Sequence, residues 1–269
     1  MLTDITLGQY FPGHSFIHRL DPRTKLVCTL IFITSIFLAE TYTAYGVLTA
    51  FAAATVALSG IPLRMIIKSL RPLWLIIVLT VLIHLATTPG TVIYSLGPLT
   101  ITQEGAKQAL LMSARLVFLI VMSSLLTFTT SPIALTDGIE RLLNPFRRFG
   151  IPAHELAMMM TIALRFIPTL LEETDRIMKA QMARGADFAQ GNLIKRAKSM
   201  VPLLVPLFIS AFRRADDLAV AMEARCYRGG ENRTRMKELR LTLQDGLAFT
   251  AILVLTVLLG VLRWNATLS

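Results

Sequence analysis

Five runs of the chain carry no charged side chain, and their length and apolar character constrain the fold more than any other feature. A helix needs about 17–25 predominantly apolar residues to cross the hydrocarbon core of a bilayer. Every run except the first, which is shorter, reaches this range. The sequence therefore predicts about five membrane-spanning helices, within residues 26–39, 41–63, 72–103, 116–136 and 246–262.

Two of these runs can be defined more closely. In the third, Thr-Thr-Pro-Gly at 87–90 ends the helix and predicts a loop after it. The fourth continues a helix that begins near Gly105, so that Arg115 lies within the span. An arginine inside a membrane is costly and often functional, which makes Arg115 a candidate functional residue. The alternative is that its side chain pairs with the backbone or extends toward the membrane surface.

The overall composition agrees with a membrane protein. Hydrophobic residues make up 54% of the 269 residues and charged residues only 16%, with a mean hydropathy of +0.61. A soluble globular domain carries about 25% charged residues. This balance excludes a disordered chain, a collagen-like chain and a disulfide-rich secreted domain. We expect an all-α polytopic membrane protein.

Lysine and arginine are distributed unevenly along the chain. Three lie within 19–25 and three within 64–71, whereas the intervening segments 39–45 and 89–104 contain none. Cytoplasmic loops carry an excess of these residues, so the N-terminus is expected inside and, after five spans, the C-terminus outside. We attribute the net charge of +10 to such loops, and expect the lipid bilayer and no nucleic acid among the partners.

The longest stretch without a predicted span is 131–240. It holds 18 Lys and Arg against 12 Asp and Glu, and the same rule places it in the cytoplasm. Its apolar, proline-bearing stretches indicate long helices that lie against the membrane part. We expect three parts: 1–130 with four spans, 131–240 as a cytoplasmic helical block, and 241–269 with the last span.

An internal repeat lies within the cytoplasmic block. The segment DRIMKAQMARG at 175–185 aligns with DDLAVAMEARC at 216–226, at an offset of 41 residues. The pattern predicts two long helices that each end in Ala-Arg, one stopped by Gly185 and the other by Gly229-Gly230. Four matches can also arise by chance in alanine-rich helices, which is the alternative. The identical pairs are Asp175 and Asp216, Ala180 and Ala221, Ala183 and Ala224, and Arg184 and Arg225.

These residue types suit a contact with another protein. Small side chains on one face allow a second helix or a partner backbone to approach closely, and four alanines are candidates for that role. A cation is favoured at the C-terminus of a helix, where the side chains of Arg184 and Arg225 can project. The alanines in question are Ala180, Ala183, Ala221 and Ala224.

The chain lacks the common catalytic motifs. No phosphate-binding G-x-x-x-x-G-K-[ST] occurs, and Met158 stands where a metalloprotease H-E-x-x-H motif beginning at His154 would need its second histidine. We therefore expect no catalytic residue, no metal ligand and no cofactor in this chain.

Together these features resemble the transmembrane T component of energy-coupling factor (ECF) transporters. HRLDPRTKL at 18–26 is similar to the sequence before that family's first span. Ala183-Arg184-Gly185 matches the family's Ala-Arg-Gly motif, and Ala224-Arg225-Cys226 departs from it at the third position.

The resemblance implies a non-catalytic scaffold in the cell membrane of a prokaryote. Its coupling helices would rest on two ABC-type ATPase subunits that bind ATP and Mg²⁺, with the two motifs as the docking points. Its membrane part would hold an S protein that binds a vitamin or another micronutrient. The residues alone leave two rivals open, a secondary transporter and a membrane-embedded lipid-phosphate enzyme. Neither is favoured, because paired broken helices and spaced acidic residues are absent.

Overall fold

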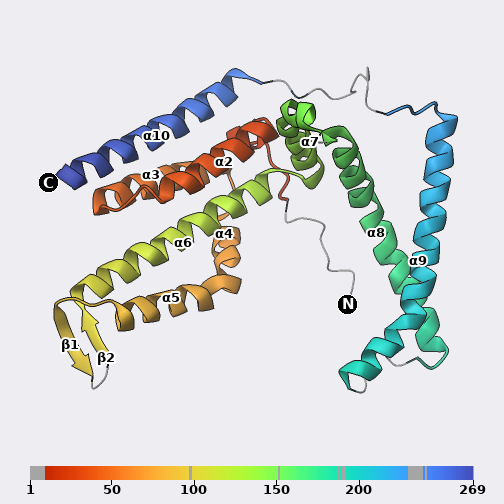
Figure 1. The fold of residues 1–269 in the computed structure, drawn as a ribbon, viewed down its shortest axis with the longest axis horizontal. Helices are drawn as coiled ribbons and strands as arrows, with labels where there is room; N and C mark the ends of the chain where they lie inside the picture. The colour runs from red at the N-terminus through yellow and green to blue at the C-terminus, as the bar shows by residue number, and fades with distance from the viewer. Residues whose placement is uncertain are drawn as a thin grey trace. The chain divides into compact units, whose positions relative to one another are not determined.

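The computed structural model describes residues 10–96, 99–150, 152–186, 188, 192–229, 239 and 241–268, and within them the protein is helical apart from one β-hairpin (Figure 1). The expected all-α membrane fold is confirmed, with the hairpin as an addition. In chain order the elements are α1 (Phe16–Arg19), α2 (Pro22–Ile36), α3 (Tyr42–Ser59), α4 (Leu63–Leu70), the 3-10 turn η1 (Arg71–Leu73), α5 (Trp74–Thr87), β1 (Val92–Leu96), β2 (Leu99–Thr102), α6 (Gln103–Thr129), α7 (Pro132–Leu143), η2 (Asn144–Phe149), α8 (Ala153–Ala183), α9 (Leu193–Ala224) and α10 (Leu243–Leu268).

The hairpin replaces part of the loop expected after the third span. β1 and β2 pair antiparallel, with Val92 opposite Thr102 and Leu96 opposite Leu99. Valine, isoleucine, threonine and tyrosine are frequent between 92 and 102, and these residues favour strands. Local propensity thus accounts for an element that a search for apolar runs does not find.

Within the described residues, five helical segments are long and apolar enough to cross a membrane: Tyr42–Ser59, Leu63–Thr87, Gln103–Thr129, Ala153–Ala183 and Leu243–Ala266. The number of candidate spans agrees with the prediction from the sequence, but the segments that qualify are not all the same. The first expected span, α2, is only 15 residues long, whereas α8 of the expected cytoplasmic block qualifies by length and composition. The fourth span ends at Thr129 rather than 136, because Thr130 is extended just before Pro132, which begins α7.

By their contacts, the residues form two compact units. The first, called here the core unit, comprises 8–138 and 239–269, and the second, called the arm unit, comprises 139–238. The core unit packs α2, α3, α6 and α10 around fully buried apolar side chains, and Phe32 stacks on Phe51 with ring centroids 5.7 Å apart. The most deeply buried of these side chains are Phe32, Ile36, Leu48, Ile252 and Leu259.

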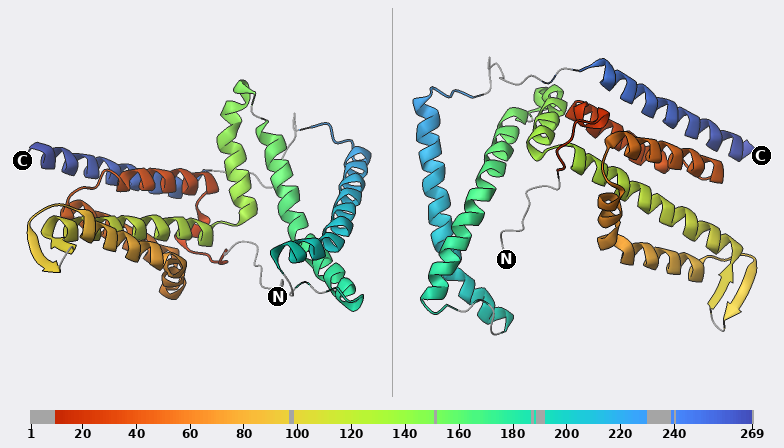
Figure 2. Two further views of the ribbon diagram at one scale, coloured as in Figure 1. Left: turned by 60° about the horizontal axis from the view of Figure 1, so that its bottom comes forward. Right: turned by 180° about the vertical axis from the view of Figure 1, so that it is seen from behind.

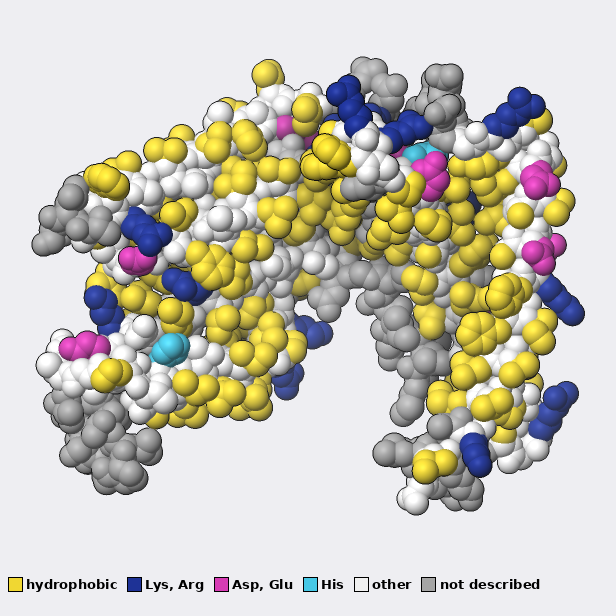
Figure 3. Space-filling model, viewed as in Figure 1, with side chains coloured by type: hydrophobic (Ala, Val, Ile, Leu, Met, Phe, Trp, Pro, Cys, Tyr) yellow, Lys and Arg dark blue, Asp and Glu magenta, His cyan; other side chains and the backbone are white. Residues whose placement is uncertain are grey.

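α5 packs along α6 but buries none of its own residues fully (Figures 1 and 2). Trp74, at its first position, is 59% exposed, and the apolar side chains that follow are similarly open. Hydrophobic side chains accordingly cover much of the visible face of the core unit (Figure 3). Such a surface is stable next to lipid and not next to water.

The HRLDPRTKL segment makes a buried polar connection between α2 and α10. Asp21 caps α2 by accepting a hydrogen bond from the Arg23 backbone, and Pro22 occupies the first helical turn, where its missing N–H costs nothing. Asp245 of α10 accepts the Asp21 backbone N–H at 2.8 Å, and its second oxygen accepts the backbone N–H and hydroxyl of Thr242. We call this group of residues the α2–α10 clamp.

Lys25 extends the α2–α10 clamp to α6. Its ammonium is buried and donates to the backbone oxygens of Thr129 at 2.9 Å and His18 at 3.2 Å. Arg23 donates to the backbone oxygen of Leu239, which precedes α10. The basic residues before the first span therefore do more than orient the chain, since they fix the start of α2 to the ends of two other helices.

In the arm unit, α8 and α9 run in opposite directions and cross near the C-terminus of α8 (Figure 2). Arg214 donates to Glu173 at 3.2 Å, and the Gln181 amide donates to the backbone oxygen of Pro202 at 3.4 Å. Both helices continue through internal prolines, Pro168 in α8 and Pro202 and Pro206 in α9. The expected pair of long helices is thus present.

Candidate functional site

The two Ala-Arg segments end their helices with the same hydrogen bonds. At the end of α8, the backbone N–H of Gly185 donates to the oxygen of Met182 at 2.9 Å, and that of Ala186 donates to Gln181 at 3.0 Å. At the end of α9, Cys226 donates to Glu223 at 2.8 Å and Tyr227 donates to Met222 at 3.0 Å. Each bond of the first end has its counterpart 41 residues later. The repeat is therefore structural and not only compositional.

At both helix ends, the residue directly after the arginine must adopt the left-handed backbone conformation. Gly185 takes this conformation with φ +89°, as expected from the sequence. In the second end Cys226 takes it, with φ +57°, among the described residues the only non-glycine with a positive φ. The expectation that Gly229-Gly230 stops this helix is wrong, because α9 already ends at Ala224. Cysteine in place of the motif's glycine thus keeps the backbone geometry of the helix end, but the backbone at Cys226 is strained.

The strain at Cys226 gives a prediction. Cys226→Gly should stabilise the end of α9, and Gly185→Ala should destabilise the end of α8, each by about 1 kcal/mol, because a side chain disfavours left-handed backbone. Hydrogen exchange of the last turn of each helix measures this directly. Slower exchange after Cys226→Gly together with faster exchange after Gly185→Ala is expected. Unchanged exchange in both would show that the conformation carries no strain.

The motif side chains are open to solvent in this chain. Arg184 and Arg225 are exposed at their helix ends, and so are the four alanines. The alanines are therefore not buried between α8 and α9, and their close contact with a partner stays a prediction. The exposed alanines are Ala180, Ala183, Ala221 and Ala224.

The two arginines lie at opposite ends of the crossed helices. The Gln181 side chain places the end of α8 beside Pro202, and Ala224 lies 22 residues further along α9. At 1.5 Å per residue, this separates the two motifs by about 30 Å. The arm unit thus presents two equivalent cationic helix ends that are far enough apart to contact different partner surfaces.

Arg115 lies at the middle of α6 and faces the core unit. Its guanidinium carbon is 5.2 Å from the centre of the Phe37 ring, directly after α2, and Nη1 approaches the Met112 sulfur at 3.6 Å. Its Nε is buried with no hydrogen-bond acceptor among the described residues. A cation over an aromatic face is a favourable arrangement away from water. The charge therefore has a packing partner within the core unit, and a functional role for Arg115 stays a prediction.

The structure also reveals residues that the sequence did not single out. Asp245 is 3% exposed and joins the α2–α10 clamp, although it looked like the charged boundary of a span. The Nδ1 atom of His154 lies 3.1 Å from the Oε1 atom of Glu140, within hydrogen-bond distance. Within the described part of the chain, no three His, Cys, Asp or Glu side chains gather as metal ligands would.

The fold thus defines a helical multi-pass membrane protein that carries a pair of long helices with matching cationic ends. Residues 13–236 match the family model described as cobalt transport protein, CbiQ, and the chain belongs to that family. The resemblance stated from the motifs, to the T component of ECF transporters, is confirmed.

Individual relatives match over nearly the whole chain. A protein of Acidaminococcus fermentans named energy-coupling factor transporter transmembrane protein EcfT is 61% identical over 98% of this chain and 99% of its own. Proteins of the same name from Thermosediminibacter oceani and Bacillus subtilis are 64% and 48% identical, over 95% and 98% of this chain and 97% and 100% of their own. Transmembrane transport as part of an ECF transporter is therefore the function of the class.

Proposed function

We propose that this protein is the membrane scaffold of an ECF-type importer, in which it couples ATP hydrolysis by two ABC-type ATPase subunits to uptake of a vitamin or other micronutrient. The micronutrient is bound by a separate S protein in the membrane. The observation that carries the proposal is the equivalence of the two helix ends. Two similar ends at a distance suit two similar ATPase subunits, one for each end.

Arginine suits this docking role for a chemical reason. The guanidinium is always charged and presents a planar fork of donors to carboxylate or carbonyl oxygens. Inserted into a desolvated groove, such a side chain commonly dominates an interface. A helix end that carries it can transmit a movement of the ATPase along α8 or α9 as a rigid rod. The cofactors ATP and Mg²⁺ belong to the partners in this proposal, in agreement with the missing phosphate-binding motif.

The test is purification of the tagged chain from its native membrane, followed by mass spectrometry of what accompanies it. Two ATPase subunits and a small membrane S protein are expected. The isolated chain is expected to bind neither ATP nor the transported compound. Stoichiometric ATP binding by the isolated chain, or its purification alone from membranes that contain the ATPases, would contradict the proposal.

Orientation gives a second prediction, for which the chain carries its own probe. Cys226 is exposed beside Arg225, and the proposal places it in the cytoplasm with the N-terminus. A membrane-impermeant maleimide should therefore miss Cys226 in intact cells and label it in inside-out vesicles that have been stripped of the ATPase subunits. In the Cys226→Ser background, a cysteine introduced by Asn265→Cys near the C-terminus of α10 should be labelled in intact cells and not in inside-out vesicles. Labelling of Cys226 from outside intact cells would reverse the orientation and remove the ATPases from its reach.

A further inference from the structure

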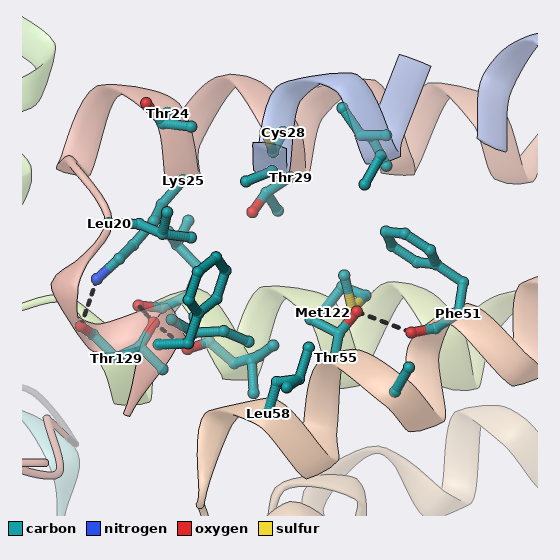
Figure 4. A pocket seen from close by; sticks show the side chains of 18 of the residues that line it. Leu20, Thr24, Lys25, Cys28, Thr29, Phe51, Thr55, Leu58, Met122 and Thr129 are labelled. Atoms are coloured by element: carbon teal, nitrogen blue, oxygen red, sulfur yellow. Dashed lines mark hydrogen bonds between the residues drawn. The ribbon is translucent and has the colours of Figure 1, made fainter. Parts of the chain in front are cut away.

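The core unit contains an apolar cavity of about 230 Å³ that the transport proposal does not use (Figure 4). It lies between α1, α2, α3, α6 and α10, and it is lined almost entirely by carbon atoms. Engineered apolar cavities of about 150 Å³ stay dry and take up small hydrocarbons. This cavity is partly open, and its carbon lining offers water almost no hydrogen-bond partner, so an apolar occupant suits it better than water. The lining includes Phe16, Cys28, Phe51, Met122, Leu126 and Ile252.

The cavity lies at one end of the core unit. Its lining residues come from the first turns of α2 and α10 and from the last turns of α3 and α6. This is the end that carries Arg19 before α2 and Arg23 and Lys25 in its first turn, so the orientation proposed above places it in the cytoplasmic leaflet. The cavity is far too small for a helix, which is about 10 Å wide with its side chains. A single hydrocarbon chain is the kind of group that fits.

Positive charge surrounds the same end. Lys25 lines the cavity, and its ammonium donates to the backbone oxygens of His18 and Thr129 within reach of the charges of Asp21 and Asp245. α4 is amphipathic, with Arg64 and Lys68 exposed on one face and Leu63 and Ile67 exposed beside them. A short basic helix with exposed apolar residues is typical of the surface of an anionic membrane.

α4 begins close to the α1 side of the cavity. A β-carbon built on Gly60, which follows α3, would lie 3.7 Å from the β-carbon of Ser15, which caps α1. Arg64 follows Gly60 by four residues, and Arg19 follows Ser15 by four. Each of the two neighbouring segments therefore carries an exposed arginine four residues after this approach.

We propose that the cavity binds an acyl chain of an anionic phospholipid from the cytoplasmic leaflet, with the headgroup held near Arg19, Arg64, Lys68 and Lys25. The bound lipid fills the space between α3 and α10 and stabilises the core unit. The inference rests on the orientation proposed above and is independent of ATPase docking.

Retention of lipid through delipidating washes in detergent tests this site. Ala54→Phe and Ala251→Phe would fill the cavity, whereas Ala53→Phe on the same helix points elsewhere and is the matched control. Native mass spectrometry should find phosphatidylglycerol on the wild type and on Ala53→Phe, and about tenfold less on the filled variants. Equal retention on all four proteins, or retention of detergent only, would overturn the proposal.

Charge and position are tested separately. Arg64→Gln with Lys68→Gln should remove the preference for phosphatidylglycerol over phosphatidylethanolamine while a lipid is still retained. For wild-type protein in membranes, phosphatidylglycerol with a photoreactive acyl chain should label peptides that contain Cys28 or Met122. Labelling confined to α5 would overturn the proposal even if a filled variant failed to fold. Cys226 labelling and ATPase co-purification on the same preparations separate this failure from a failure of the transport proposal.

Discussion

The double variant Arg184→Glu/Arg225→Glu should purify without its ATPase subunits and support no uptake, while its membrane helices stay folded. Loss of one partner from a buried, charge-assisted contact costs about 2–5 kcal/mol, and reversal of the charge adds repulsion. A large interface can survive one such loss, so each single variant should retain the complex with weakened coupling. Two losses at separate docking points should release both ATPases.

Uptake and ATPase co-purification across Ala, Lys and Glu variants measure this effect. Lysine should restore function only in part, because it keeps the charge but lacks the planar fork. Arg176→Glu with Arg213→Glu is the matched control, since both residues are exposed on α8 and α9 but lie outside the motifs. Wild-type uptake by the double Glu variant would show that Arg184 and Arg225 are ordinary charges at helix ends.

Asp245→Ala should be the most destabilising single substitution in the core unit. It leaves the buried backbone N–H of Asp21 and the backbone N–H of Thr242 without their acceptor and removes a negative charge near the buried Lys25. Such losses add up to about 3 kcal/mol. We expect the melting temperature in detergent to fall by about 6–12 °C. The melting temperature of the Asp245→Asn variant, which keeps one acceptor oxygen, should fall less.

Glu40→Ala is the control for this substitution. Glu40 pairs with Arg263 at 2.9 Å, but both side chains are about half exposed, so loss of the pair should cost less than about 1 kcal/mol. Circular dichroism during heating measures both variants. An equal shift for Asp245→Ala and Glu40→Ala would mean that the α2–α10 clamp contributes no more than a surface ion pair.

Apolar runs predicted most of the helices because a bilayer requires continuous, internally hydrogen-bonded helices wherever the chain is apolar. The same argument could not define α2, whose start depends on Asp21 and Pro22 and on a contact with Asp245 that is 224 residues away. It also missed the hairpin, because a search for apolar runs and helix stops does not take account of the strand propensity between 92 and 102. Long-range contacts and local propensity are the two sources of these differences.

For the candidate site, the sequence predicted the positions of Arg184 and Arg225 and the likeness of their surroundings. It could not predict that Cys226 would adopt the left-handed conformation in place of glycine, because the decision depends on where α9 ends. Nor could it decide whether the alanines face each other or a partner. That depends on how α8 and α9 cross, which the Glu173–Arg214 and Gln181–Pro202 contacts fix.

Photo-crosslinking from the two helix ends tests the central claim most directly. Met182 and Glu223 are equivalent positions in the two ends, both are exposed, and either can carry a photoreactive residue while the arginines remain intact. In the complete transporter, each position should form an adduct with an ATPase subunit, and Arg184→Glu should abolish only the adduct from 182. Adducts with lipid or with the S protein from both positions, and none with an ATPase, would contradict the account.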